Sequence, residues 1–237
     1  MSDQTPSWIA KDCLDVGLFT NQLEDMLKFW QTDVGLAFDH MLPVGGGVRQ
    51  YRHDFFGAVL KLNHARDPLS PASRGGYLRL IIAQDGRTEI QDLTDPDGNS
   101  LRLVPIGHGG VEHWAIEVAT ASAEAFLNHY HYSLGLPRLQ DHLAVRCGRS
   151  LIVGVIAPDI ADETDAGEMR RTGFRYTTIQ VAKVDSLHAQ AVEQGATEGA
   201  PPLTLGKTAR ISFLKDGHGN WMELSQRASI TGSLDPG

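Results

Sequence analysis

Short segments of alternating or continuous apolar residues recur along this chain, and each predicts a β-strand. Three longer segments place apolar residues three and four positions apart, which is the spacing of an amphipathic helix. The predicted helices span residues 21–32, 122–132 and 185–194. Strands are predicted at residues 13–20, 48–56, 57–63, 76–83, 88–93, 100–105, 112–118, 141–146, 150–156, 174–181, 203–205, 209–215 and 220–225.

A unit of one strand, one helix and three strands therefore recurs along the chain. It is complete in three places and shortened, without a helix, in residues 76–105. Repeats of this size indicate one supersecondary unit that is stacked to complete a shared core. The Gly-rich link at residues 106–110 is the candidate domain boundary. It separates a pair of units at 12–106 from a pair at 111–228, with tails at 1–11 and 229–237.

The last predicted strand carries a carboxylate among large apolar residues. Trp221 and Glu223 point to one face of it, while Met222 and Leu224 point to the other. A buried carboxylate has to be paired or bind a metal ion, whereas an edge strand would leave Glu223 in solvent. The turn and strand recur at residues 95–103, where Arg102 stands in the register of Glu223.

The composition is that of an ordinary soluble globular protein, with 237 residues, 41% hydrophobic and 21% charged. The net charge of −8 argues against a nucleic-acid partner. No apolar run approaches the roughly 18 residues that span a membrane, and the first residues lack the pattern of a signal peptide. Two cysteines form no framework, so we expect a cytoplasmic protein. The acidic segment at 158–172 is expected to be a surface loop rather than a lid.

Three segments resemble the vicinal oxygen chelate superfamily, which includes glyoxalases, bleomycin-resistance proteins and ring-cleaving dioxygenases. They are residues 14–36, the Tyr-Ser-Leu-Gly-Leu of 132–136, and Asp-Gly-His-Gly-Asn-Trp-Met-Glu-Leu at 216–224. The resemblance implies an α+β fold of repeated βαβββ modules that form two cupped mixed sheets, with helices packed outside. In that superfamily the cup holds a metal ion and a small substrate.

The resemblance places candidate metal ligands at His113, which opens the third unit, and at Glu223, which closes the fourth. The implied cofactor is a divalent ion (Fe, Mn, Zn or Ni). Tyr176 stands where dioxygenase-like members carry a second histidine, so it is a weak ligand, a proton donor or a cavity wall. Glu117 shares the face of His113 but lies about 13 Å along the strand, too far to bind the same ion. It is a second candidate for proton transfer. His142, on the neighbouring strand, is a candidate to complete the metal's ligands or to bind the substrate.

The first two units carry a different set of charges. The positions that correspond to His113 and Glu223 are Asp15 and Arg102, and Lys61 closes the first unit. Two cations and one carboxylate would repel a divalent metal. We expect either a structural salt bridge or a pocket in which Arg102 binds a carboxylate.

Two functions are consistent with these residues. The first is a metal-dependent lyase, isomerase or dioxygenase acting on a small substrate with vicinal oxygens, with Tyr176 or Glu117 moving a proton. The alternative is a non-catalytic protein that sequesters a flat ligand against Trp221 and other aromatic walls. A homodimer is what the resemblance implies. His129 and His131 diverge on their helix and are expected at the surface.

Overall fold

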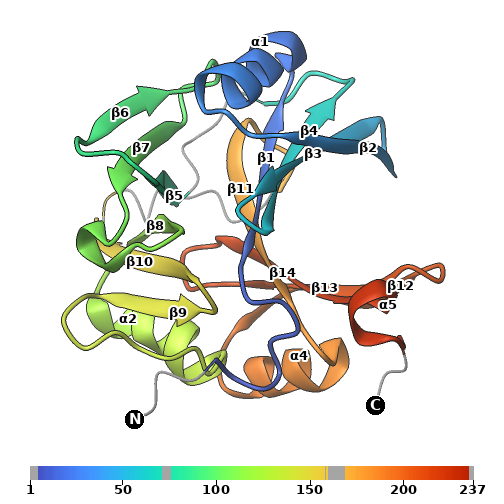
Figure 1. Cartoon of the computed structure of the whole chain (residues 1–237). Coiled ribbons are helices and arrows are strands. Elements are labelled where there is room, and N and C mark those ends of the chain that lie inside the picture. Colours follow the sequence, from blue (N-terminus) through green and yellow to red (C-terminus); the bar gives the residue numbers. More distant parts are fainter. Residues whose placement is uncertain (1–4, 71–75, 158, 160–168, 235–237) are drawn as a thin grey trace.

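The chain forms two mixed β-sheets, one of eight strands and one of six, with the longer helices outside them (Figure 1). A computed structural model describes residues 5–70, 76–157, 159 and 169–234. Parallel and antiparallel neighbours occur in both sheets. The larger sheet is curled into a half-barrel, which brings side chains of strands that are not neighbours into contact across its concave face. The predicted α+β fold with repeated units is confirmed.

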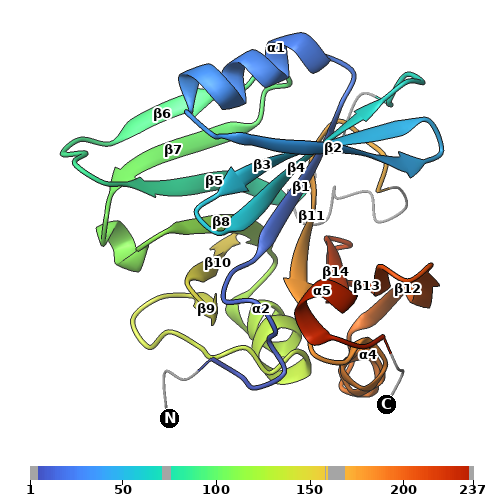
Figure 2. The same ribbon diagram turned by 45° about the vertical axis from the view of Figure 1, so that its right-hand side comes forward.

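The larger sheet has an antiparallel pair of strands at its centre. In spatial order its strands are β12 (Thr197–Leu205), β13 (Ala209–Lys215), β14 (Trp221–Arg227), β11 (Gly173–Gln180), β1 (Asp15–Thr20), β4 (Ala58–Ala65), β3 (Val48–Phe55) and β2 (Phe38–Gly45). At the centre, Gly17 of β1 pairs with Tyr176 of β11. The edge strands β2 and β12 lie one above the other on the right in Figures 1 and 2.

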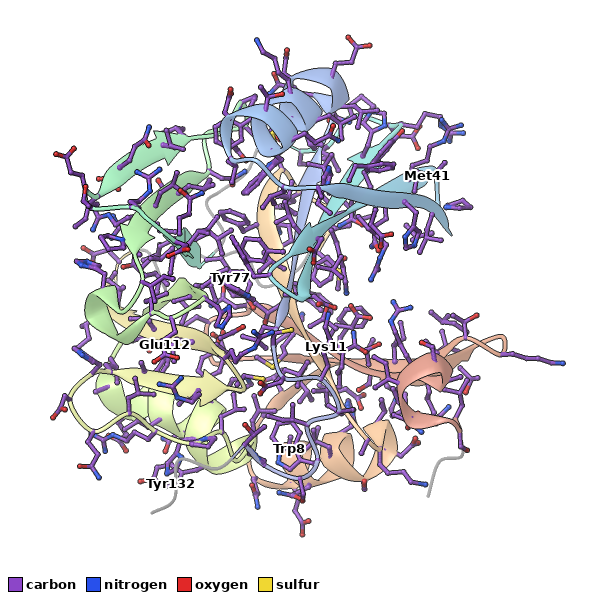
Figure 3. All side chains as sticks on the ribbon, in the orientation of Figure 1. Trp8, Lys11, Met41, Tyr77, Glu112 and Tyr132 are labelled. Atoms are coloured by element: carbon purple, nitrogen blue, oxygen red, sulfur yellow. The ribbon has the colours of Figure 1, made fainter. Side chains whose placement is uncertain are left out.

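The smaller sheet is joined to the larger one through its β5 strand. In spatial order its strands are β6 (Gln91–Thr94), β7 (Ser100–Pro105), β5 (Tyr77–Gln84), β8 (Trp114–Thr120), β10 (Ser150–Ile156) and β9 (Ala144–Cys147). The hydroxyl of Tyr77, labelled in Figure 3, donates to the carbonyl oxygen of Trp221 at 2.6 Å. One apolar cluster takes residues from both sheets and includes Phe55 against Trp114, with ring centroids 5.2 Å apart.

The helices contribute the large side chains of this core. They are α1 (Leu23–Lys28), which continues as a wider π-helical turn η1 (Phe29–Asp33), α2 (Ala123–Leu127), which continues as the π-helical turn η3 (Asn128–Ser133), and α4 (Val184–Glu193). Short turns form η2 (His108–Gly110) and α5 (Ala228–Thr231). Trp30 and Tyr130 are fully buried. His129 is also buried at 6% exposure, so its predicted surface position is wrong, because the π-helical turn rotates it toward the core. None of the described helices is long and apolar enough to cross a membrane.

The sheets join the four units in an order different from the expected pairs at 12–106 and 111–228. The first unit (β1–β4) shares a sheet with the fourth (β11–β14), and the second (β5–β7) with the third (β8–β10). In every unit the first strand lies at one end of the strand order and pairs with only one strand of its own unit, so one of its edges stays open. An open edge needs a partner for its backbone groups, and first strands pair with first strands: β1 with β11, and β5 with β8.

The repeated turn that the sequence predicts is present in both copies. The carboxylate of Asp95 accepts hydrogen bonds from the backbone and side-chain amides of Asn99 at 2.8 and 2.7 Å. Asp216 accepts the same two bonds from Asn220 at 3.0 and 2.9 Å. Arg102 and Glu223 each lie three residues after the asparagine of their turn. The two turns and strands are therefore equivalent in backbone position, but one carries a cation where the other carries a carboxylate.

Several element boundaries differ from the prediction. No bounds were predicted for strand β2, because most of its residues are exposed and show little periodic signal. The strand predicted at 203–205 is the end of the longer β12, and only Ala144–Cys147 of the segment 141–146 is a strand. Most of the acidic segment at 158–172 lies outside the described residues.

Candidate functional site

A cavity of about 500 Å³ opens on the concave face of the eight-stranded sheet. Alternate residues of a strand share a face, so each of β1, β4, β11 and β14 turns every second side chain toward the concave face. Most of the wall is apolar, with a small polar group at the floor. The lining residues are Phe19, Leu42, Pro43, Val44, Gln50, Lys61, Asn63, Met169, Tyr176, Leu205, Thr208, Ala209, Ile211, Phe213, Glu223 and Arg227.

Lys61 of β4 places a buried ammonium group at the floor of this cavity. Lys61 is 1% exposed. Its Nζ donates to Thr178 Oγ1 at 2.6 Å and to Glu223 Oε2 at 2.8 Å. Strands β4 and β14 are separated by β1 and β11, which in a flat sheet would put them about 14 Å apart. The short contact is therefore possible because the sheet is strongly curled.

Glu223 is held on one oxygen and free on the other. Thr178 Oγ1 donates to Glu223 Oε2 at 2.7 Å, the same oxygen that accepts from Lys61. Within the described residues, Glu223 Oε1 has no hydrogen-bond partner, and the side chain lines the cavity. Strand β14 lies between β11 and β13, and Glu223 is 7% exposed, so the edge-strand alternative is wrong.

Asp15 adds a second buried carboxylate beside Lys61. It accepts from Lys11 Nζ at 2.8 Å, from the backbone N–H of Val59 at 2.9 Å and from Gln180 Nε2 at 3.1 Å, and Lys61 Nζ lies 4.0 Å away. Burial acts to raise the pKa of Asp15, but the charges of Lys61 and Lys11 outweigh it and lower that pKa. A salt bridge was expected among Asp15, Arg102 and Lys61; the structure pairs Asp15 with Lys61, while Arg102 binds Asp92.

Tyr176 covers the polar floor with its ring. Gly17 makes room for it, because a Cβ at residue 17 would lie 2.2 Å from two atoms of the Tyr176 ring. The phenol oxygen accepts from Asn63 Nδ2 at 3.2 Å and from Gln50 Nε2 at 3.4 Å, and Lys61 Nζ lies 5.3 Å from the ring centre. Burial, followed by the charge of Glu223, raises the pKa of Tyr176 well above its usual value. The phenol is therefore neutral at pH 7 and keeps its proton for a hydrogen bond.

The structure does not bring His113 to Glu223. His113 directly precedes β8 in the other sheet, and its Nε2 lies 3.2 Å from Arg149 Nη1. Arg149 also donates to the carbonyl oxygen of Phe56 at 3.3 Å and forms an ion pair with Asp12 at 3.5 Å. His113 is not among the residues that line the cavity of Glu223.

Three other predicted residues line a separate cavity of about 220 Å³ on the six-stranded sheet: Arg102, Glu117 and His142. Nε and Nη2 of Arg102 donate to the two carboxylate oxygens of Asp92 at 2.7 and 2.9 Å, so this bidentate side of the guanidinium group is already used. Glu117 is held in the same way by Arg79, at 2.8 and 3.0 Å. Glu117 and Tyr176 therefore belong to different sheets and different cavities.

Trp221 is partly buried beside the cavity of Glu223 without lining it. Its ring packs against Phe213, with centroids 5.9 Å apart, and Lys215 Nζ lies 4.2 Å from its centre. Trp221 thus supports the wall residue Phe213.

The donor set at the cavity floor does not fit a divalent metal ion. Two carboxylates, Asp15 and Glu223, converge there, but the ammonium of Lys61 lies between them and would repel a second cation. In the part of the chain that the structure describes, no three His, Cys, Asp or Glu side chains form a group that could hold a metal ion. The ammonium group of Lys61 thus supplies the positive charge between the two carboxylates at the cavity floor.

Solved structures with the same architecture are found at low sequence identity. A variant of glyoxalase I from Zea mays has 14% identity and a TM-score of 0.69, over 95% of this chain and 97% of that one. A putative dioxygenase from Bacillus subtilis has 9% identity and a TM-score of 0.64, over 98% and 92%. The cppA protein from Streptococcus pneumoniae has 12% identity and a TM-score of 0.56, over 93% and 99%. No protein-family model and no curated protein sequence matches this chain.

The two cupped sheets and these similarities define the class of fold. This chain has the vicinal oxygen chelate fold, as the resemblance of its turns and strands implies. Within that fold, its four units along one chain are arranged as in the maize glyoxalase I structure, nearly the whole of which it matches.

Sequence reasoning missed most of the polar floor: Gln50, Arg52, Asn63, Thr178 and Arg227. Alternate positions of β3 and β4, among them Gln50, Arg52, Lys61 and Asn63, are polar, which is the usual pattern of a solvated face. A signal was present, because Lys61 and Asn63 stand between the apolar residues Leu60, Leu62 and Ala65. The burial of the polar positions follows only from the curl of the sheet.

Proposed function

We propose that this protein binds a small organic molecule with an apolar body and an oxygen-containing head in the cavity of the eight-stranded sheet. The observation that carries the proposal is the buried ammonium of Lys61 at the floor of an apolar cavity. Small-molecule sites are commonly apolar clefts with a few well-placed polar groups. Lys61, with the neutral phenol of Tyr176, would attract an electronegative oxygen without a metal ion.

The test is binding of 2-naphthol, a flat probe with one hydroxyl, measured by isothermal titration calorimetry in the presence of EDTA. We expect saturable binding that is unaffected by the chelator. Ile211→Trp fills the cavity from β13 and is expected to weaken binding at least ~10-fold, which is about 1.4 kcal/mol. Val192→Trp, on the exposed side of α4, is the matched control and keeps wild-type affinity. Equal affinity in both variants would place the probe elsewhere and refute the proposal.

A second candidate is an enzyme that moves a proton, favoured by the free oxygen of Glu223. Glu223 Oε1 would take a proton from a carbon next to a carbonyl group. The electron pair of the broken C–H bond moves to the carbonyl oxygen, and Lys61 and the Tyr176 hydroxyl stabilise the resulting enolate. The proton then returns to carbon, so the substrate is isomerised or exchanges hydrogen with water.

Proton exchange separates this candidate from simple binding. Hydroxyacetone in D₂O would exchange its carbon-bound hydrogens faster with wild-type protein than with Glu223→Gln, as followed by NMR. Ile211→Trp is expected to abolish the exchange as well, because it closes the cavity. The same exchange rate with and without protein would leave binding as the function.

The metal-dependent form of this activity, with Fe, Mn, Zn or Ni held partly by His113 and Glu223, has a separate test. Elemental analysis of protein incubated with each metal ion and then desalted measures the bound ion directly. From the donor set we expect less than one ion per chain in the wild type and in His113→Ala. Stoichiometric metal that is lost in His113→Ala would instead support the metal-dependent enzyme.

A further inference from the structure

Among the residues that the structure describes, two arginine side chains near the cavity, Arg52 and Arg227, have no hydrogen-bonded carboxylate partner. Arg52 of β3 is 7% exposed and donates from Nη1 to Gln50 Oε1 at 2.8 Å, while its buried Nε has no acceptor among the described residues. Arg227, at the end of β14, lines the cavity, and its buried Nε also lacks an acceptor there. Gln50 lines the cavity too, so it holds the Arg52 guanidinium beside this space.

Other arginines on both sheets show what is unusual here. Arg79, Arg102 and Arg210 each use two guanidinium nitrogens on one carboxylate: Glu117, Asp92 and Asp185, respectively. These three are all more exposed than Arg52, which is buried without such a carboxylate. A buried guanidinium without an anion is costly, because it has lost much of its hydration.

The charges at the cavity floor do not balance. Asp15 is paired with Lys11, and Glu223 with Lys61, so each carboxylate already has its own ammonium group. Among these six described side chains, four cations (Lys11, Arg52, Lys61 and Arg227) stand against two carboxylates (Asp15 and Glu223), an excess of two positive charges. Burial, followed by the charge of Arg227, lowers the pKa of Arg52, while the charges of Asp15 and Glu223 act in the opposite direction.

We infer that the ligand of this cavity is a small organic acid whose carboxylate binds between Arg52 and Arg227. The inference rests on the proposed function and names the chemical class of the ligand. A carboxylate matches the fork of a guanidinium and accepts two hydrogen bonds from it. A singly charged head suits the site, because the free oxygen of Glu223 nearby would repel a second negative charge. The apolar body packs against Phe19, Leu42 and Phe213, which line the same cavity.

The test compares 2-naphthoate with 2-naphthol, two probes with the same ring system that differ in the charge of the head. We expect wild-type protein to bind 2-naphthoate at least ~10-fold more tightly, by about 1.4 kcal/mol, in calorimetric titrations at pH 7.5. Arg227→Met, at a partly exposed strand end, is expected to weaken binding of 2-naphthoate more than binding of 2-naphthol, and so to remove most of this preference. Arg210→Met is the matched control. Arg210 lies on β13 opposite Gln226, the residue before Arg227, and its guanidinium group binds Asp185. It is expected to keep the preference.

The outcomes separate the two proposals. If 2-naphthol binds in the cavity but 2-naphthoate binds no more tightly, the inference is overturned while the proposed function stands. A preference for 2-naphthoate that persists in both Arg227→Met and Arg52→Met also overturns it. If the wild type binds neither probe, the proposed function fails and the inference fails with it. Loss of the preference in Arg227→Met alone, with Arg210→Met unchanged, supports both.

Discussion

Lys61→Met is the substitution that most directly tests the buried ion pair. Methionine keeps the length and volume of the side chain but removes the charge that faces Glu223 at 2.8 Å and Asp15 at 4.0 Å. Asp15 keeps Lys11, whereas Glu223 keeps only the hydroxyl of Thr178. Removing one partner of a buried ion pair costs roughly 3–5 kcal/mol, against a total stability of about 5–15 kcal/mol. The variant is expected to fold, with a large loss of stability.

Urea unfolding followed by circular dichroism measures this loss. With a slope of about 2–3 kcal/mol per molar urea, the midpoint is expected to fall by roughly 1–3 M at pH 8. Lys61→Met combined with Glu223→Leu replaces the pair by apolar groups and is expected to recover much of the loss.

The control for this series is Arg210→Met, which breaks a partly exposed pair with Asp185 in the same sheet. Its expected cost is below about 1 kcal/mol. The reasoning is refuted if Lys61→Met has the stability of the wild type, or if the double variant is no more stable than Lys61→Met alone.

Three further predictions concern the same sheet and its core. Gly17→Ala forces the Tyr176 ring out of its place and is expected to cost ~1–3 kcal/mol in thermal unfolding; an unchanged melting temperature would contradict the close approach. Tyr176→Phe removes the acceptor of two amide donors and should cost about 1 kcal/mol in urea unfolding, with a midpoint equal to the wild type counting against those bonds. Burial lowers the pKa of His53 and of His129 below 6.5, so the unfolded chain takes up these protons first and stability falls as pH drops below 6.5. In His53→Gln/His129→Asn the urea midpoint should change less between pH 7.5 and pH 5.5, and an equal change would show that other groups cause it.

The fold could be predicted from the chain because its evidence is local. The turns at Asp95 and Asp216 each form within five residues, and the amphipathic spacing of the helices and the apolar strands is visible in short windows. Glu223 stood out for the same reason, as a carboxylate within an apolar strand. The prediction that a buried Glu223 has to be paired or bind a metal ion is met by pairing.

The partner of Glu223 could not be predicted, because it depends on which units share a sheet. Lys61 lies 162 residues earlier in the chain, and only the antiparallel pairing of β1 with β11 brings the two together. The prediction joined His113 to Glu223 because the resemblance places metal ligands at these positions and the third and fourth units were expected to form one cup. Arg52 was missed since a polar residue on an alternating strand has the pattern of an exposed one until the sheet curls over it.

The pairing of the first unit with the fourth has a consequence for how the protein acquires its site during synthesis. Residues 77–156 contain every strand of the six-stranded sheet, which can assemble from neighbouring segments while the ribosome is still translating the rest. The eight-stranded sheet has to wait, because β11, which pairs with β1, begins more than 150 residues after it. Contacts of such long sequence separation form slowly. Until β11 and β14 are made, the sheet that carries Lys61 lacks Thr178 and Glu223, the two side chains that bind its ammonium group.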